Sequence, residues 1–175
     1  MALQVVSPST VDTQALGEQL GRLLEVGDIV CLYGELGSGK TVLSKGIAKG
    51  LGVSPERAVR SPSFVLIQRY QGRVPVYHAD LYRLDGPTDI ADIGLREFLA
   101  GDGVAVIEWA DKLDASLPSE RLDIALAHQT EQTRLITITP QGARYRQRFE
   151  RWQSQPPARE EPCDPGGDGV GIASV

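Results

Sequence analysis

The sequence predicts an α/β fold in which a mixed, mostly parallel β-sheet is covered by helices and is completed by a C-terminal antiparallel strand pair. Two short apolar runs, at residues 28–33 and 104–107, have the composition of buried strands. The first run is followed, over residues 41–51, by apolar side chains at helical spacing. A glycine-rich loop, residues 34–41, joins this strand to this helix and is the most informative stretch of the chain.

The N-terminal elements are a strand and a helix. Residues 3–6 (LQVV) form a short strand, and a helix begins near Asp12, a suitable N-cap, and stops at Gly27. One face of this helix is apolar and consists of Leu16, Leu20, Leu23 and Leu24. The helix over residues 41–51 ends at Gly52.

The second half of the chain predicts more strands than helices. Strands at residues 64–70 and 74–78 are separated by Gln-Gly-Arg, a short hairpin-like connection. A helix with a threonine cap is expected over residues 88–100. Residues 122–126 and 135–139 form the closing antiparallel pair.

The C-terminal region changes character at residue 153. Residues 144–152 (RYRQRFERW) alternate basic and aromatic side chains and predict a terminal helix. This helix is either a solvated amphipathic helix or a docking face for an RNA or protein partner. From Gln153 onward the chain is rich in Pro and Gly and poor in aromatic residues, so we expect residues 153–175 to be disordered.

Composition limits the class of protein. The 175 residues are 41% hydrophobic and 23% charged, as in a globular domain with a sizeable core. The formal net charge of −5 argues against a broad basic surface that grips nucleic acid unaided. Cys31 and Cys163 suggest neither a metal site nor a disulfide framework. With no visible secretory signal and no apolar run long enough to span a bilayer, we expect a cytoplasmic protein without membrane contact.

The loop from Gly34 to Thr41, GELGSGKT, fits the pattern G-x-x-x-x-G-K-[ST] in the strand-to-helix context that the pattern requires. Its glycines let backbone N–H groups curve around phosphate oxygens, and the helix start adds its positive end. Lys40 supplies charge for the β- and γ-phosphates, and the Thr41 hydroxyl is a ligand for Mg²⁺. A glycine-rich turn without a ligand is the alternative. The loop therefore predicts a P-loop NTPase-like three-layer sandwich, with residues 1–152 as a P-loop ATPase domain.

Acidic residues at two strand ends are candidate partners of the loop. Glu108 follows VAVI and would hold Mg²⁺ or its water shell, unless it is only a solvated strand end. Asp80 would orient the attacking water, or it caps a loop. Trp109 is either a core or interface aromatic or a wall of the nucleotide site. We expect His78 to be a packed strand residue rather than a ligand, and Arg83 to form a surface ion pair rather than an anion clamp.

Together these motifs resemble the bacterial TsaE family, also called YjeE, whose members are ATPases that take part in making threonylcarbamoyladenosine in tRNA. The resemblance covers roughly residues 5–145. The stretches that carry it are DTQALG (12–17), GELGSGKT (34–41), SPSF (61–64), YHADLYRL (77–84) and IEWAD (107–111). YHADLYRL and IEWAD, in this order after a P-loop, are far more specific than the P-loop alone.

The resemblance implies roles for matching positions. The residues that would hold the phosphates are Gly37, Ser38, Gly39, Lys40, Thr41 and Val42. Thr41 and Glu108 would bind the metal, and Asp80, Glu108 and Lys40 would be catalytic.

Other positions would contact the rest of the nucleotide. Trp109 would lie beside it, Thr13 near the adenine and Arg134 on the opposite side. Ser63 stands where the family usually has threonine, which keeps a hydroxyl in this switch-like loop but loses a methyl group.

The resemblance also implies cofactors and partners. Family members act with TsaB and TsaD, so this chain would bind that pair, hydrolyse ATP with Mg²⁺, and meet tRNA only indirectly through the complex. The transfer of the threonylcarbamoyl group would belong to the partner. Intrinsic hydrolysis should be slow, because no arginine is obviously placed to stabilise developing charge.

Two other functions fit a P-loop. A small-molecule kinase would use Asp80 as a base, but it needs a lid with several arginines, and residues 83–103 offer only Arg83 and Arg96. A non-catalytic interaction module would keep nucleotide only for stability. Replacing Asp80 or Glu108 would then leave partner function intact.

Overall fold

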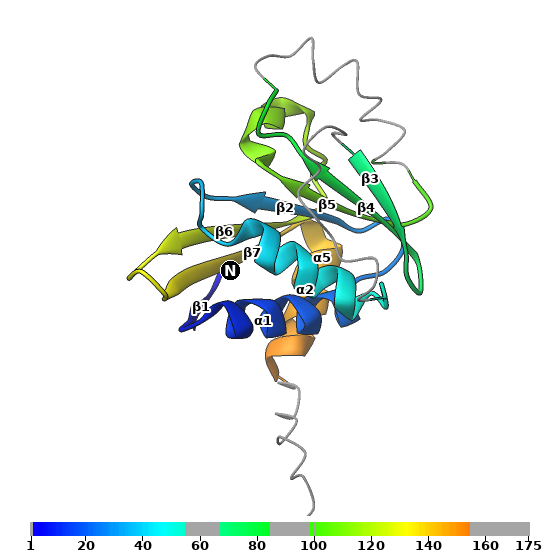
Figure 1. The fold of residues 1–175 in the computed structure, drawn as a ribbon. Coiled ribbons are helices and arrows are strands. Elements are labelled where there is room, and N and C mark those ends of the chain that lie inside the picture. The colour runs from blue at the N-terminus through cyan, green and yellow to red at the C-terminus, as the bar shows by residue number, and fades with distance from the viewer. Residues whose placement is uncertain (1, 55–66, 85–98, 100, 155–175) are drawn as a thin grey trace, which may run out of the picture.

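The structure is a computed structural model that describes residues 2–54, 67–84, 99 and 101–154. Within these residues one sheet contains seven strands in the order β1-β7-β6-β2-β5-β4-β3 (Figure 1). The strands are β1 (Leu3–Ser7), β2 (Ile29–Tyr33), β3 (Ile67–Gln71), β4 (Pro75–Asp80), β5 (Val104–Glu108), β6 (Arg121–His128) and β7 (Arg134–Gln141). The helices are α1 (Thr10–Leu23), α2 (Lys40–Gly50), the 3₁₀ helix η2 (Ala110–Ser116) and α5 (Gly142–Ser154).

The centre of the sheet is parallel. β2 pairs in parallel with both β5 and β6, and β4 pairs in parallel with β5. β7 runs antiparallel to β6 and β1, and β3 forms an antiparallel hairpin with β4. The predicted mixed, mostly parallel sheet with a C-terminal antiparallel pair is therefore confirmed. Because β2, β4 and β5 share a direction, their carboxyl ends meet at one edge, where α/β proteins place their ligands.

Each face of the sheet has its own hydrophobic core. Alternate residues of β2 separate the two cores: Val30 and Leu32 join the cluster under α1 and α2, whereas Ile29 and Cys31 join the cluster that includes η2. Helices therefore cover both faces, with α1 and α2 side by side on one of them (Figure 1). Burying one Val, Leu or Ile side chain contributes about 1.5–3 kcal/mol to the free energy of unfolding, so the two cores hold the layers together.

Helices α1 and α2 pack in parallel through glycines. Gly17 and Gly21 of α1 face Gly46 and Gly50 of α2, so that backbone contacts backbone. A Cβ built on Gly46 would lie 2.2 Å from the carbonyl oxygen of Gln14. This close parallel packing places the first turn of α1 beside the first turn of α2, which follows the glycine loop.

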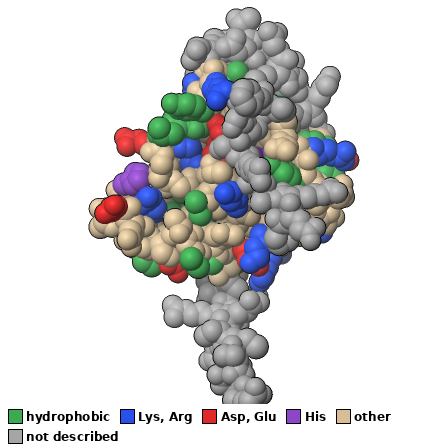
Figure 2. All heavy atoms as spheres, in the orientation of Figure 1, with side chains coloured by type: hydrophobic (Ala, Val, Ile, Leu, Met, Phe, Trp, Pro, Cys, Tyr) green, Lys and Arg blue, Asp and Glu red, His purple; other side chains and the backbone are tan. Residues whose placement is uncertain are grey.

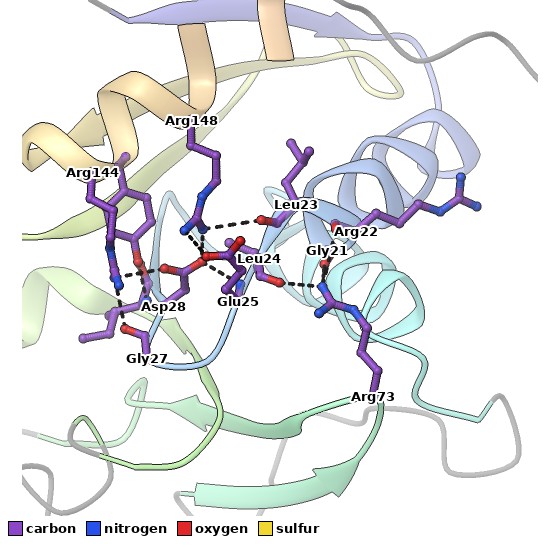
Figure 3. Close-up of polar contacts among 12 residues, drawn as sticks. Gly21, Arg22, Leu23, Leu24, Glu25, Gly27, Asp28, Arg73, Arg144 and Arg148 are labelled. Carbon is purple, nitrogen blue, oxygen red and sulfur yellow. Dashed lines mark hydrogen bonds and ion pairs between the residues drawn. The ribbon is translucent and has the colours of Figure 1, made fainter. Parts of the chain in front are cut away.

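Helix α5 is anchored by a buried carboxylate. The side chain of Asp28 is fully buried, and Arg144 approaches its Oδ1 at 2.9 Å while Arg148 pairs with Oδ2 (Figure 3). The hydroxyl of Tyr145 accepts a hydrogen bond from the Ile29 N–H at 2.7 Å, and burial, followed by the charge of Asp28, raises the pKa of this tyrosine. Within the predicted helix at 144–152, these arginines therefore serve packing, in line with the amphipathic interpretation.

The predicted start of α1 was wrong. Ser9, not Asp12, is the N-cap: its Oγ accepts a hydrogen bond from the Asp12 N–H at 3.2 Å. Asp12 lies in the first turn, where its negative charge interacts favourably with the positive end of the helix dipole. Ser and Asp are both good caps, so residue type alone did not distinguish Asp12 from Ser9.

The predicted stop of α1 at Gly27 was also wrong. The helix ends at Leu23, and Leu24 already has an extended backbone. Arg73, from the turn between β3 and β4, donates to the carbonyl oxygen of Gly21 at 2.9 Å (Figure 3). A side chain distant in sequence thus satisfies the end of the helix that a local glycine was expected to close.

The other boundaries agree within a few residues. β2 begins at Ile29 rather than Asp28, whose carboxylate binds the arginines of α5. Three predictions lie outside the described residues: the start of the strand at 64–66, the helix at 88–100 except Leu99, and the tail from residue 155. Helix α5 continues to Ser154, so the prediction that disorder begins at residue 153 was wrong for the first two residues of that segment.

Charged side chains of both signs are interspersed over the coloured part of the surface in Figure 2, and no broad basic area is visible there. The face shown thus agrees with the expectation, drawn from the net charge of −5, that the protein lacks a broad basic surface. Among the described residues, no helix has the length and apolar character needed to cross a membrane.

The glycine contact between α1 and α2 generates a stability prediction. Gly→Ala in a helix normally stabilises by about 1 kcal/mol, but Gly46→Ala should destabilise by about 1–3 kcal/mol, because the new methyl group meets the backbone of Gln14. Urea unfolding measures the change. The exposed Lys45→Ala on the same helix is the control and should stay within about 0.5 kcal/mol. Equal stability of Gly46→Ala and the parent protein would contradict this packing.

Candidate functional site

The glycine loop has the backbone geometry of a phosphate cradle. It lies between β2 and α2, and Gly37 and Gly39 have φ values of 76° and 102°, in the left-handed region that favours glycine. A Cβ on Gly37 would meet nothing within 4 Å, so the backbone there faces open space. Gly39 is the N-cap of α2 and provides no side-chain cap, unlike Ser9 in α1. The first turn of α2 therefore begins without a side-chain acceptor, as an anion site requires.

Lys40 is folded back onto the loop. Its Nζ donates to the carbonyl oxygens of Gly34 at 2.7 Å and Glu35 at 2.9 Å, and it lies 3.8 Å from the centre of the Trp109 ring. Burial lowers the pKa of this lysine, against the opposing charges of nearby carboxylates that include Glu108. The ammonium group is thus held at the loop by weak neutral acceptors and an aromatic face, contacts that phosphate oxygens can replace.

Glu108 is the polar centre of the site. Its side chain is 2% exposed, and Oε2 accepts from the Thr41 hydroxyl at 2.9 Å. Oε1 accepts from the Ser44 hydroxyl at 2.9 Å and contacts His78 Nε2 at 2.8 Å. Burial alone would raise the pKa of Glu108, but the hydrogen bonds from His78, Ser44 and Thr41 lower it. The carboxylate is therefore ionised, buried and joined to the helix that begins with Lys40.

Strand pairing places Asp80 beside Glu108. These two residues are register partners in the parallel pair β4–β5, and Leu32 pairs with Glu108 on the other side. Asp80 Oδ1 also accepts a hydrogen bond from the Tyr82 N–H at 3.1 Å. The two acids predicted from strand ends thus lie next to each other, at the carboxyl edge where the glycine loop leaves β2.

Trp109 has a strained backbone. Among the described residues it is the one non-glycine residue with a positive φ, 60°, which is costly for a bulky side chain. Its ring packs on Tyr82 with centroids 5.0 Å apart and covers Lys40. The side chain thus lies at the edge of the second core and beside the loop, as a wall of the nucleotide site would.

Arg134 and Thr13 have partners within the protein. Arg134 Nε donates to the Ser38 carbonyl at 3.1 Å and Nη2 to the Gly37 carbonyl at 3.4 Å, so it braces the outer side of the loop from β7. Thr13 is buried in the first turn of α1, and its hydroxyl lies 2.7 Å from that of Ser7. Thr13 is thus at the helix end beside the loop.

Sequence reasoning missed the two buried partners of Glu108. Ser44 follows Thr41 by three residues, which places both on one face of α2. His78 precedes Asp80 by two residues, which places both on one face of β4. These spacings could have indicated that Ser44 and His78 lie on the same faces as Thr41 and Asp80. Ser63, which occupies the position of a family threonine, lies outside the described residues.

The donor set suits a hard cation beside phosphate. In the part of the chain that the structure describes, no group of three or more His, Cys, Asp or Glu side chains could enclose a metal. Thr41 and Glu108 instead offer one hydroxyl and one carboxylate, next to the lysine and the loop. Mg²⁺ characteristically takes one or two protein oxygens and completes its shell with water and phosphate oxygens.

Comparison with known proteins identifies the family. The family model for "Threonylcarbamoyl adenosine biosynthesis protein TsaE" matches residues 7–136. The TsaE proteins of Treponema pallidum and Bacillus subtilis are 43% and 40% identical to this chain, over 78% and 77% of it and over 99% and 83% of their own lengths. The crystal structure of Bacillus subtilis YdiB matches with a TM-score of 0.73 and 33% identity, over 88% of this chain and 95% of that one. This chain belongs to the TsaE family, the threonylcarbamoyl adenosine biosynthesis proteins.

Proposed function

We propose that this protein binds and hydrolyses ATP with Mg²⁺ as an accessory subunit of the machinery that forms threonylcarbamoyladenosine in tRNA, together with TsaB and TsaD. One observation carries the proposal: Lys40 and Thr41 at the start of α2 lie with Glu108 and Asp80 at one edge of the sheet. A glycine loop and two carboxylates that α2, β4 and β5 bring together are difficult to explain as a turn and two solvated strand ends.

Thr41 and Glu108 are the residues that would hold Mg²⁺, which supplies positive charge against the phosphate oxygens when bound. Their hydroxyl–carboxylate hydrogen bond of 2.9 Å shows that both oxygens reach one point. The low pKa of Glu108 keeps the carboxylate in the form that a cation requires.

The remaining residues of the site would position the nucleotide and the attacking water and would stabilise the charge on the phosphates. Lys40 would exchange the carbonyl oxygens of Gly34 and Glu35 for phosphate oxygens, a gain because charged acceptors bind an ammonium group more strongly. Asp80 would accept a hydrogen bond from the attacking water and fix its direction, beside Glu108. Trp109 would cover this end of the site and reduce the access of bulk water.

We expect the rate of ATP hydrolysis to depend on the partner proteins. In P-loop enzymes, an arginine that faces the loop increases the rate of hydrolysis by a large factor. Arg134 contacts the loop, but its guanidinium group is engaged with the carbonyl oxygens of Gly37 and Ser38. We therefore expect slow hydrolysis by the protein alone and faster hydrolysis with TsaB and TsaD.

An ATPase assay with and without the TsaB–TsaD pair tests this function. Asp80→Asn should lower phosphate release by roughly 10²–10⁴-fold and leave nucleotide affinity within about threefold, because it removes a water-orienting base and no phosphate contact. Lys40→Ala should weaken ADP binding at least about tenfold.

Fast hydrolysis at a rate that TsaB and TsaD do not change would contradict the proposal. Labelled phosphate transferred to an alcohol would favour a kinase, and full tRNA modification by Asp80→Asn would favour a non-catalytic module.

Arg134→Ala tests whether this arginine braces the loop or reads the nucleotide. Loss of the two carbonyl contacts should weaken ADP and GDP binding alike, by about tenfold, measured by calorimetry. Arg146→Ala, an exposed arginine on α5, is the matched control and should have no effect. Weakening of ADP binding alone would instead show recognition of the base, and unchanged affinity for both would exclude a bracing role.

A further inference from the structure

The two oxygens of the Glu108 carboxylate are held unequally. Oε1 is bonded by two groups, the hydroxyl of Ser44 at 2.9 Å and Nε2 of His78 at 2.8 Å. Oε2 is bonded by the hydroxyl of Thr41 at 2.9 Å. Ser44 and His78 come from α2 and β4, on two sides of the carboxylate, so together they fix its plane as well as its position.

The direction of the hydrogen bond between His78 and Glu108 follows from the carboxylate. An ionised carboxylate only accepts hydrogen bonds, so His78 must carry its proton on Nε2 and donate it to Oε1. The side chain is 1% exposed, and its other nitrogen, Nδ1, has no hydrogen-bond partner among the described residues. Within the described residues, the hydrogen bond to Glu108 is thus the one that the imidazole ring makes.

Burial of His78 in the strand, with Nδ1 unpartnered among the described residues, lowers the stability of the fold. Burying a polar nitrogen without a partner costs on the order of 1–3 kcal/mol. Val76, two residues earlier on the same face of β4, is also fully buried, but its apolar side chain carries no such cost. The hydrogen bond to Glu108 gives the buried His78 a role that an apolar side chain could not provide.

We propose that His78 is a positioning residue that orients Glu108 toward the magnesium ion, with Ser44 as its second support. The inference rests on the proposed function, because it assigns the groups that support its metal-linked carboxylate. With Oε1 fixed by His78 and Ser44, Oε2 is the oxygen that Thr41 shares and that is left to serve the cation or its water shell. Partners of this kind restrict a ligand to one orientation, and their loss typically lowers metal affinity 10–100-fold.

The experiment measures ADP binding by calorimetry, once with Mg²⁺ and once with EDTA, in the parent and in His78→Leu. The parent should bind ADP more tightly with Mg²⁺. In His78→Leu the benefit from Mg²⁺ should fall by about 10–100-fold, whereas the dissociation constant in EDTA should stay within about twofold. A merely structural histidine would alter both constants together.

Further variants make the test more specific. His78→Gln places an amide nitrogen near the position of Nε2 and should recover much of the Mg²⁺ benefit, and Ser44→Ala should lose part of it. Tyr77→Phe alters the adjacent residue, on the opposite face of β4, and should behave like the parent. If circular dichroism shows that His78→Leu does not fold, His78→Asn, whose shorter amide cannot reach Oε1, provides the same comparison.

The outcomes separate two failures. An unchanged Mg²⁺ benefit in folded His78→Leu or His78→Asn, with a normal benefit in the parent, would overturn the role of His78 alone. A parent protein whose ADP affinity does not respond to Mg²⁺ would overturn both this role and the proposed function on which it rests.

Discussion

The buried carboxylate of Glu108 joins the helix after the glycine loop to the neighbouring strands, and the geometry of the site depends on this connection. Two hydroxyls one turn apart on α2 and one imidazole on β4 converge on it. Their hydrogen bonds outweigh the cost of burial and keep the group ionised. A helix start held against a strand end in this way fixes Lys40 and Thr41 relative to Asp80. The site is therefore largely formed by the protein itself, which limits the reorganisation required of a ligand.

The scaffold supports this arrangement from both sides. On one side, the glycines of α1 and α2 bring the helix backbones into contact and leave little freedom for α2 to shift. On the other side of the sheet edge, Trp109 keeps a strained backbone and covers Lys40. Strain of this type persists only where the surroundings hold it in place, and it is concentrated at functional sites. At the far end of α1, Asp28 anchors α5 through two arginines, so that helix completes the core instead of offering those charges to a partner.

Local signals explain what the sequence predicted correctly. The loop pattern, the apolar runs of β2 and β5, and the acids at strand ends each occupy a few adjacent residues, so no tertiary information was needed to find them. The partners of Glu108 were missed because Ser44 and His78 are 64 and 30 positions away from it, and only the sheet register and the helix rotation bring them together. The same reason applies to Arg73, which is 52 residues from the Gly21 carbonyl it satisfies. The start of α1 was misplaced for a different reason, since Ser9 and Asp12 are both competent caps.

A crystal structure with a non-hydrolysable ATP analogue and Mg²⁺ would show whether phosphate and metal replace the present contacts of Lys40 and Thr41. We expect Lys40 Nζ to leave the carbonyl oxygens of Gly34 and Glu35 for phosphate oxygens, and the Thr41 hydroxyl to turn from Glu108 to the metal. A nucleotide bound elsewhere, with Lys40 still on those carbonyls and Thr41 still on Glu108, would contradict this expectation.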